Sequence, residues 1–202
     1  MPRSRSDHAS SLPIHSMRNP EMVDPIAAWH TDHVYFRRLL NLLDGQLAVF
    51  HTGESPNYEL MRDIVYYLRE FSDQVHHPRE DVAFARLAKR SLGIDMELNR
   101  LSQEHRVIAR AGQILLQSLE GILGGAIIPR ADMEAAAATY LVYYRNHIAA
   151  EEREILPRAG RLLTAEDWQA VAAAVPAVND PLFGDDPQDR FRELRREISR
   201  ET

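Results

Sequence analysis

Two histidine–carboxylate pairs with the same spacing are the part of this chain best suited to chemistry. His76 is followed four residues later by Glu80, and His147 is followed four residues later by Glu151. Residues four apart lie on one face of a helix, so each imidazole and its carboxylate can reach a common point. This mixture of ligands suits iron, manganese or zinc, whereas calcium prefers oxygen ligands. The repeat therefore predicts two halves of one buried metal site.

Two further histidines lie on apolar helical faces of the same kind. His33 is centred on a heptad stripe that runs from Trp29 to Phe50, and His105 on a stripe from Leu98 to Ile122. A polar core network without metal is the alternative, but burying uncompensated carboxylates costs several kcal/mol. We therefore predict six metal ligands: His33, His76, Glu80, His105, His147 and Glu151.

Several neighbouring side chains compete for the same role. His30 shares a face with His33 and is a candidate for an additional ligand or gate, as are the phenols of Tyr140 and Tyr144. His77 could pair with Glu80, but His76 reproduces the spacing of the second motif and is preferred.

Other acidic residues are expected to support the ligands rather than bind metal. Asp73, one turn before His76, could accept the second N–H of that imidazole and fix its tautomer. Glu152 should point toward solvent or support a ligand, and Asp81 and Glu104 should lie on the outer face or beside a ligand.

The elements that must position these residues are four long helices. Asp24-Pro25 and Ser55-Pro56 are start signals, and the apolar pattern predicts helices over 24–50, 55–92, 95–123 and from about 129 past Pro157. Pro78 should kink the second helix. Short connections between long helices predict an all-α, antiparallel up-down-up-down four-helix bundle with short C-terminal helices.

The domain organisation follows from the same pattern. Residues 1–22 are polar and aperiodic and are predicted to form a disordered tail, 23–163 the bundle, and 164–202 a C-terminal helical extension. The arginines of the last helix are expected to form a solvated face rather than a binding patch.

Bulk composition excludes several classes of protein. The chain has 202 residues, a formal net charge of −6 and no cysteine. The acidic charge argues against nucleic acid as a partner, and the lack of cysteine excludes iron–sulfur clusters and thiolate zinc sites. No signal-peptide core or membrane span is visible, so a cytoplasmic protein without membrane contact is expected, and a homodimer is permitted.

Taken in order, the ligand blocks resemble the hemerythrin-like (HHE cation-binding) family over about residues 24–163. The flanks agree: Trp-x-x-Asp-His ending at His33, the His-His-Pro-Arg-Glu-Asp run, Glu104-His105, and His-Ile-Ala-Ala-Glu-Glu. The resemblance implies a four-helix bundle with two non-haem iron ions, joined by the two carboxylates and a bridging oxo or hydroxo group. It implies dioxygen or a related small oxidant, such as peroxide or nitric oxide, as the partner.

One departure from hemerythrin itself affects the expected function. The third helix carries a single histidine, His105, with Leu101 and Ala109 where a second ligand would stand. Each iron would then be five-coordinate, unless His30 or a tyrosine restores the count. We expect a protein that binds or senses dioxygen or small oxidants. The alternatives are a redox enzyme acting on peroxide or nitric oxide, an iron-delivery protein in stress repair, and a metal-dependent regulatory module.

Overall fold

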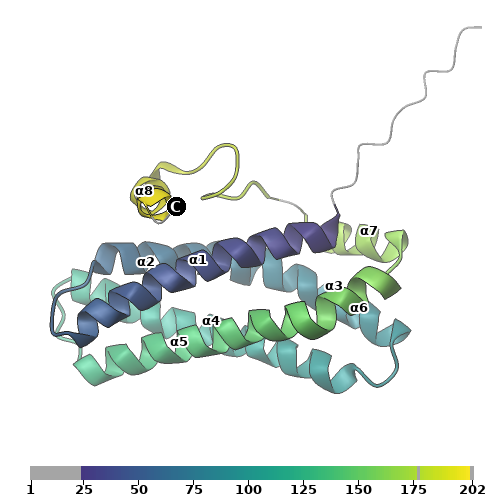
Figure 1. Ribbon diagram of the computed structural model, residues 1–202, viewed down its shortest axis with the longest axis horizontal. Coiled ribbons are helices and arrows are strands. Elements are labelled where there is room, and N and C mark those ends of the chain that lie inside the picture. Colours follow the sequence, from purple (N-terminus) through teal and green to yellow (C-terminus); the bar gives the residue numbers. More distant parts are fainter. Residues whose placement is uncertain (1–23, 177, 201–202) are drawn as a thin grey trace, which may run out of the picture.

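The structure, a computed structural model, describes residues 24–176 and 178–200, and within them it is helical with no strand. Four long helical segments lie alongside one another and short helices follow them (Figure 1). The tail predicted over residues 1–22 lies outside the described residues.

The four long segments agree in number and order with the sequence prediction. The first is α1 (Pro25–His51), in which Asp24 accepts a hydrogen bond from the backbone of Ile26 at 3.0 Å. The second comprises α2 (Tyr58–Tyr67), η1 (Leu68–His76) and α3 (His77–Arg90). The third is α4 (Asp95–Leu123), and the fourth comprises α5 (Arg130–Ala150), η2 (Glu151–Ile155) and α6 (Leu156–Leu162).

The second and fourth segments each contain a stretch of π-helix just before a proline. The stretch η1 ends two residues before Pro78, and η2 ends two residues before Pro157. Proline cannot donate to the carbonyl four residues back, and a wider turn absorbs that missing bond without ending the helix. One inserted residue also rotates the following face by about 100°. This local widening brings the His76–Glu80 pair into phase with the apolar residues before it.

The hydrophobic core is divided into two clusters by the histidines and glutamates of the motifs. One cluster contains Phe36, Val75, Ile108 and Tyr144, and the other contains Trp29, Ala83, Leu101 and Ile155. On every long segment, the predicted ligands fall between a residue of the first cluster and a residue of the second. The layer that contains the predicted ligands is therefore closed on both sides by apolar packing.

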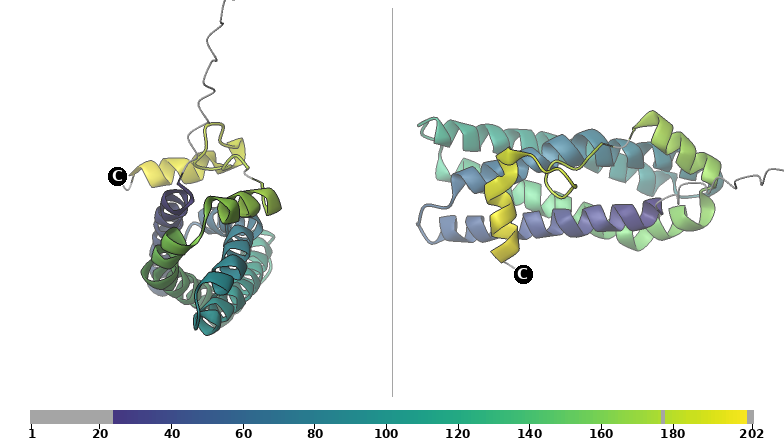
Figure 2. Two further views of the ribbon diagram at one scale, coloured as in Figure 1. Left: turned by 90° about the vertical axis from the view of Figure 1, so that its right-hand side faces the viewer. Right: turned by 90° about the horizontal axis from the view of Figure 1, so that it is seen from above.

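The C-terminal extension packs on the outside of the long segments. Helix α7 (Ala165–Ala174) begins with a capping box between Thr164 and Asp167 and lies against α3. After a loop, η3 (Asp189–Phe191) leads into α8 (Arg192–Arg200), which crosses α1 and α2 (Figure 2). Leu194 and Ile198 are buried at that crossing, so the apolar face of α8 is used for packing within this chain.

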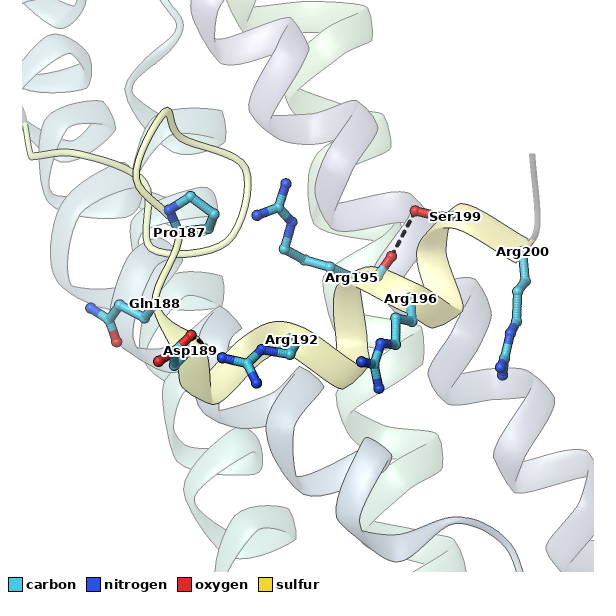
Figure 3. Close-up of a pocket in the computed structure, with 8 residues that line it drawn as sticks. All are labelled: Pro187, Gln188, Asp189, Arg192, Arg195, Arg196, Ser199 and Arg200. Atoms are coloured by element: carbon cyan, nitrogen blue, oxygen red, sulfur yellow. Dashed lines mark hydrogen bonds and ion pairs between the residues drawn. The ribbon is translucent and has the colours of Figure 1, made fainter.

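The arginines around α8 surround a shallow surface hollow but are mostly neutralised locally (Figure 3). Arg192 pairs with Asp189, Arg196 pairs with Glu193 at 2.9 Å, and Arg200 pairs with Glu197. Such exposed pairs are typical of a solvated helix face. None of the described helices is both long enough and apolar enough to cross a membrane.

Candidate metal centre

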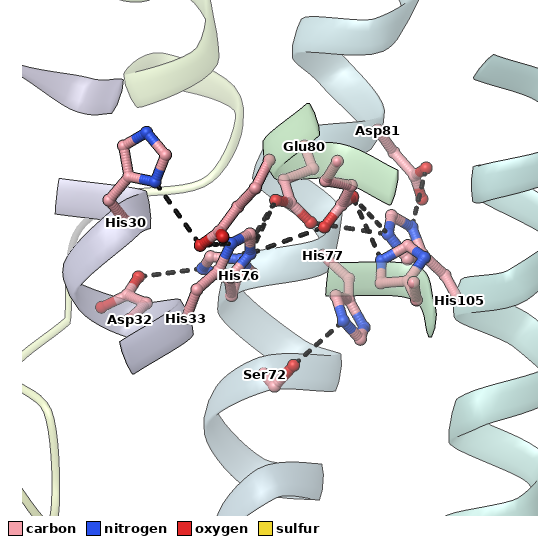
Figure 4. A network of polar contacts seen from close by, with 12 residues as sticks. His30, Asp32, His33, Ser72, His76, His77, Glu80, Asp81 and His105 are labelled. Atoms are coloured by element: carbon pink, nitrogen blue, oxygen red, sulfur yellow. Dashed lines mark hydrogen bonds and ion pairs between the residues drawn. The ribbon is translucent and has the colours of Figure 1, made fainter. Parts of the chain in front are cut away.

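The structure brings all six predicted ligands together in the interior of the long segments. His33 comes from α1, His76 from the end of η1, Glu80 from α3, and His105 from α4. His147 and Glu151 come from the junction of α5 and η2. All six side chains are buried, with no residue more than 5% exposed. Figure 4 shows the histidines and carboxylates converging across the helices.

The separations between neighbouring donor atoms fit ligands that share one metal ion. His33 Nε2 lies 3.2 Å from His76 Nε2, and His76 Nε2 lies 3.1 Å from Glu80 Oε1. His147 Nε2 lies 3.1 Å from Glu151 Oε1. Two donors bound at right angles, each about 2.1 Å from a metal, would be roughly 3 Å apart. The donor atoms already stand at that spacing.

Both glutamates reach between two pairs of imidazoles. Glu80 places Oε1 3.7 Å from His33 Nε2 and Oε2 3.5 Å from His105 Nε2. Glu151 places Oε2 3.5 Å from His33 Nε2 and Oε1 3.6 Å from His105 Nε2. Each carboxylate therefore places one oxygen toward His33 and the other toward His105.

The central donor atoms lack ordinary hydrogen-bond partners. Neither oxygen of Glu80 or Glu151 makes a hydrogen bond of acceptable geometry to any described residue, although all four oxygens are buried. The Nε2 atoms of His105 and His147 are also buried without such a partner. Buried polar atoms are normally satisfied, because leaving one unpaired costs about 1–3 kcal/mol. A cation is the partner that suits so many convergent acceptors.

The outer nitrogen of each imidazole faces a second carboxylate. The Nδ1 atoms of His76, His105 and His147 lie 2.9 Å from Asp32, 3.1 Å from Asp81 and 3.2 Å from Glu104. His33 Nδ1 is 3.3 Å from Glu152, which also binds Arg37. Carboxylates in this position fix the tautomer that directs Nε2 toward a metal. Asp81, Glu104 and Glu152 thus occupy the supporting positions expected from the sequence.

The partner of His76 differs from the sequence expectation. Asp32, from α1, takes the place predicted for Asp73. Asp73 instead lies 3.5 Å from His77 Nδ1 and 3.9 Å from Arg69. The position of Asp32 next to His33 could have suggested a role at the centre. Its contact with His76 joins two helices, however, and spacing along one helix does not predict such a contact.

The charges of the centre shift the pKa values of its groups strongly. Burial alone would lower the pKa of His76, but the charge of Glu80 and the bond to Asp32 raise it to about 10. Burial alone would also lower the pKa values of His105 and His147. The nearby carboxylates outweigh burial and raise the pKa of His105 to about 11 and that of His147 to about 8. Burial alone would raise the pKa of Glu80, but the charge of His76 and the nearby imidazoles of His105 and His33 together lower it well below its usual value. These directions favour protonated imidazoles facing ionised carboxylates, as imidazolium–carboxylate pairs, when no metal is bound.

His77, for which the spacing of the motifs made His76 the preferred ligand, also lies at the centre. Donor atoms of His77, Glu80, His105 and His147 lie within 4.8 Å of one another, while His33, His76 and Glu80 form a second such group. The His77 ring stacks on that of His105 at 4.2 Å, and its Nε2 is 3.1 Å from Ser72 Oγ. Burial and the nearby His105 hold the pKa of His77 well below its usual range, so the ring is neutral. Neutral imidazole is the form that binds metal.

Of the other candidates for an additional ligand, His30 is exposed and the two tyrosines are buried. His30 is exposed on α1, with its Nδ1 3.5 Å from Glu152 Oε1. The hydroxyl of Tyr144 donates to Ser72 Oγ, which connects it with His77. The hydroxyl of Tyr140 is buried without a hydrogen-bond partner among the described residues.

Comparison with known proteins agrees with this geometry. Residues 24–159 match the hemerythrin HHE cation binding domain, and the chain belongs to that family. No curated protein and no solved structure matches the chain. The family and the buried histidine–glutamate cluster together indicate a metal-binding helical protein.

Proposed function

We propose that this protein holds two iron ions in an antiparallel, up-down-up-down four-helix bundle and uses them to bind or sense dioxygen or a related small oxidant. The observation that carries the proposal is the position of Glu80 and Glu151, each with an oxygen toward His33 and an oxygen near His105. Short loops at 52–57, 91–94 and 124–129 favour antiparallel neighbours.

In this proposal the ligands divide into two sets that share the carboxylates. His33 and His76 hold one ion, His105 and His147 hold the other, and Glu80 and Glu151 join them. His77 is the added donor on the side of His105, since its donor atom lies within 4.8 Å of those of His105 and His147. Iron in such a site supplies one-electron redox chemistry toward small oxygen and nitrogen species.

The surrounding residues prepare the centre for this role. Asp32, Asp81 and Glu104 hold the outer imidazole nitrogens, so the inner nitrogens are oriented before a metal arrives. The two apolar clusters on either side exclude bulk water and large reagents. Access is thereby limited to small molecules, which fits a diatomic gas or peroxide better than a bulky substrate.

The test is anaerobic loading of the chelator-treated chain with ferrous iron, followed by separate additions of dioxygen, peroxide and nitric oxide while the absorption spectrum is recorded. A reversible adduct with dioxygen or nitric oxide supports the proposal. Sustained consumption of peroxide or nitric oxide instead assigns the chain to the enzymes. A metal-dependent melting temperature without any spectral response assigns it to the regulatory modules.

The cytoplasmic location and the possible homodimer stay predictions from the sequence.

A further inference from the structure

A cavity of about 520 Å³ lies outside the metal centre, where the C-terminal extension covers α1 and the η1–α3 helix. Its walls include five aromatic side chains: Trp29, Tyr35, Phe71, Trp168 and Phe183. Trp29 meets Trp168 edge-on at 5.3 Å, and Tyr35 lies parallel to Phe183 at 3.9 Å. Flat apolar walls favour a flat aromatic ligand, because ring–ring contacts add to the burial of apolar area.

The charged groups of the same wall leave unused hydrogen-bonding capacity. Asp32 is bound to His76 through Oδ2, but its Oδ1 makes no hydrogen bond to a described residue. Arg79 donates from Nε to the carbonyl of Val175 at 3.0 Å, and its two terminal nitrogens bind no described residue. The cavity therefore presents one free acceptor and one free donor group beside its aromatic walls.

The carboxylate of the third charged residue, Asp180, is already hydrogen-bonded to other residues of the chain. Its carboxylate accepts hydrogen bonds from Tyr67 at 2.9 Å and from the backbone of Leu182 and Phe183 at 2.8 and 2.9 Å. These bonds hold the loop that forms the wall, so they belong to the construction of the cavity. Asp180 still contributes negative charge, which disfavours an anionic ligand, while Arg79 disfavours a cationic one.

We propose that this cavity binds a neutral hydroxylated aromatic molecule of the phenol or hydroquinone class. The ring lies against Trp29 and Trp168, and the hydroxyl group donates to Asp32 and accepts from Arg79. Because Asp32 also binds His76, the ligand sits one carboxylate away from the candidate metal centre. The inference rests on the cavity alone, so it holds whether or not the chain proves to bind iron.

The two tryptophans make the proposal directly measurable. The chain has two tryptophans, and both line this cavity. In the ¹⁵N-labelled full chain, as isolated and after chelator treatment, we expect hydroquinone added without air to shift both indole N–H resonances in a saturable way. Cyclohexane-1,4-diol, which keeps the hydroxyls but lacks the aromatic ring, should shift neither, and benzoate should bind more weakly.

Arg79→Met should weaken hydroquinone binding about tenfold, as expected for the loss of one charged hydrogen bond. Arg106→Met, on the exposed face of α4, is the matched control and should leave binding unchanged. Absence of a saturable shift in either form of the folded chain would overturn the proposal, as would equal binding by wild type and Arg79→Met. Indole shifts that change on dilution of the protein alone would also overturn it, because a second copy of the chain would then occupy the cavity.

Discussion

The Nε2 atoms of His33 and His76 lie 3.2 Å apart, although the two residues come from different helices and are 43 positions apart in sequence. The Nδ1 atoms of the two rings face the carboxylates of Asp32 and Glu152. If both Nδ1 atoms carry the proton, both Nε2 atoms hold lone pairs, and neither neutral ring can donate to the other. Two ligands of one metal ion, by contrast, adopt this separation naturally. The same spacing recurs within the His147–Glu151 pair, at 3.1 Å.

Replacing a histidine of the candidate centre should lower the metal content of the chain. We expect His147→Ala to lose at least one of the bound ions, because its Nε2 faces Glu151 in the buried centre. The matched control is His51→Ala, since His51 is exposed and lies 3.6 Å from Glu134 at the surface. Metal content of the two purified variants is the measurement. Full retention in His147→Ala would contradict the assignment of the site.

Removing an outer carboxylate should weaken metal binding without removing a ligand. Asp81→Asn should lower metal affinity by about 10- to 100-fold, because Asp81 orients His105 and is itself held by Ser102 at 2.7 Å. Asp44→Asn, which loses an ion pair with Arg145 at the surface, should leave the affinity unchanged. Competition with a chromogenic chelator measures both. Equal affinities would show that the outer carboxylates have no orienting role.

His77 provides a test of the division into two ligand sets. If His77 donates on the side of His105, His77→Ala should weaken one of the two metal sites and leave the other unchanged. Ser72→Ala should keep both sites, since it removes the hydroxyl bound to the His77 ring but not the imidazole. Stepwise metal titration with calorimetry separates the two sites. Identical titration curves for wild type and His77→Ala would leave six ligands rather than seven.

The stability of the metal-free chain and its affinity for metal should change with pH in opposite directions. The pKa of His147 is about 8 in the folded chain, above its usual value of about 6.5. Its contribution to stability is therefore complete below pH 6.5 and is lost as the pH rises through 8. Chemical denaturation of the metal-free chain should show a loss of stability between pH 6 and 9, to which His147 contributes on the order of 2 kcal/mol. The raised pKa values of His76 and His105 add to the loss in the same direction.

Metal affinity should rise over the same range, because protons compete with metal for the imidazoles. His147→Gln is the control for the stability measurement, and its slope against pH should be shallower than that of the wild type. A metal-free wild type that gains stability from pH 6 to 9 would contradict the imidazolium–carboxylate pairing.

Helical spacing predicted the features that lie within one helix, and it failed to predict contacts between two helices. The ligand pairs, the stripes around His33 and His105, and the four long segments follow from local periodicity. Asp32 was missed as the partner of His76 because Asp73 satisfies the spacing within the helix, whereas Asp32 reaches across from α1. His77 was placed second because an ideal helix turns it about 100° away from His76.

The local sequence pattern also could not predict the backbone conformation around the prolines. A proline predicts a disturbed helix, but whether the chain kinks or forms a π turn depends on the packing that the following residues must reach. At Pro78 the wider turn of η1 lets both Val75 and Glu80 be buried. The start of α2 shows the same limit on a smaller scale, since Asn57 rather than Ser55 caps it.

The most direct test of the account is the metal content of the purified chain, measured by plasma emission on a sample whose absorption spectrum is recorded in air. About two irons per chain are expected, together with charge-transfer bands near the violet. One zinc per chain, or no metal with an unchanged fold, would contradict it and would leave the helical bundle without the proposed function.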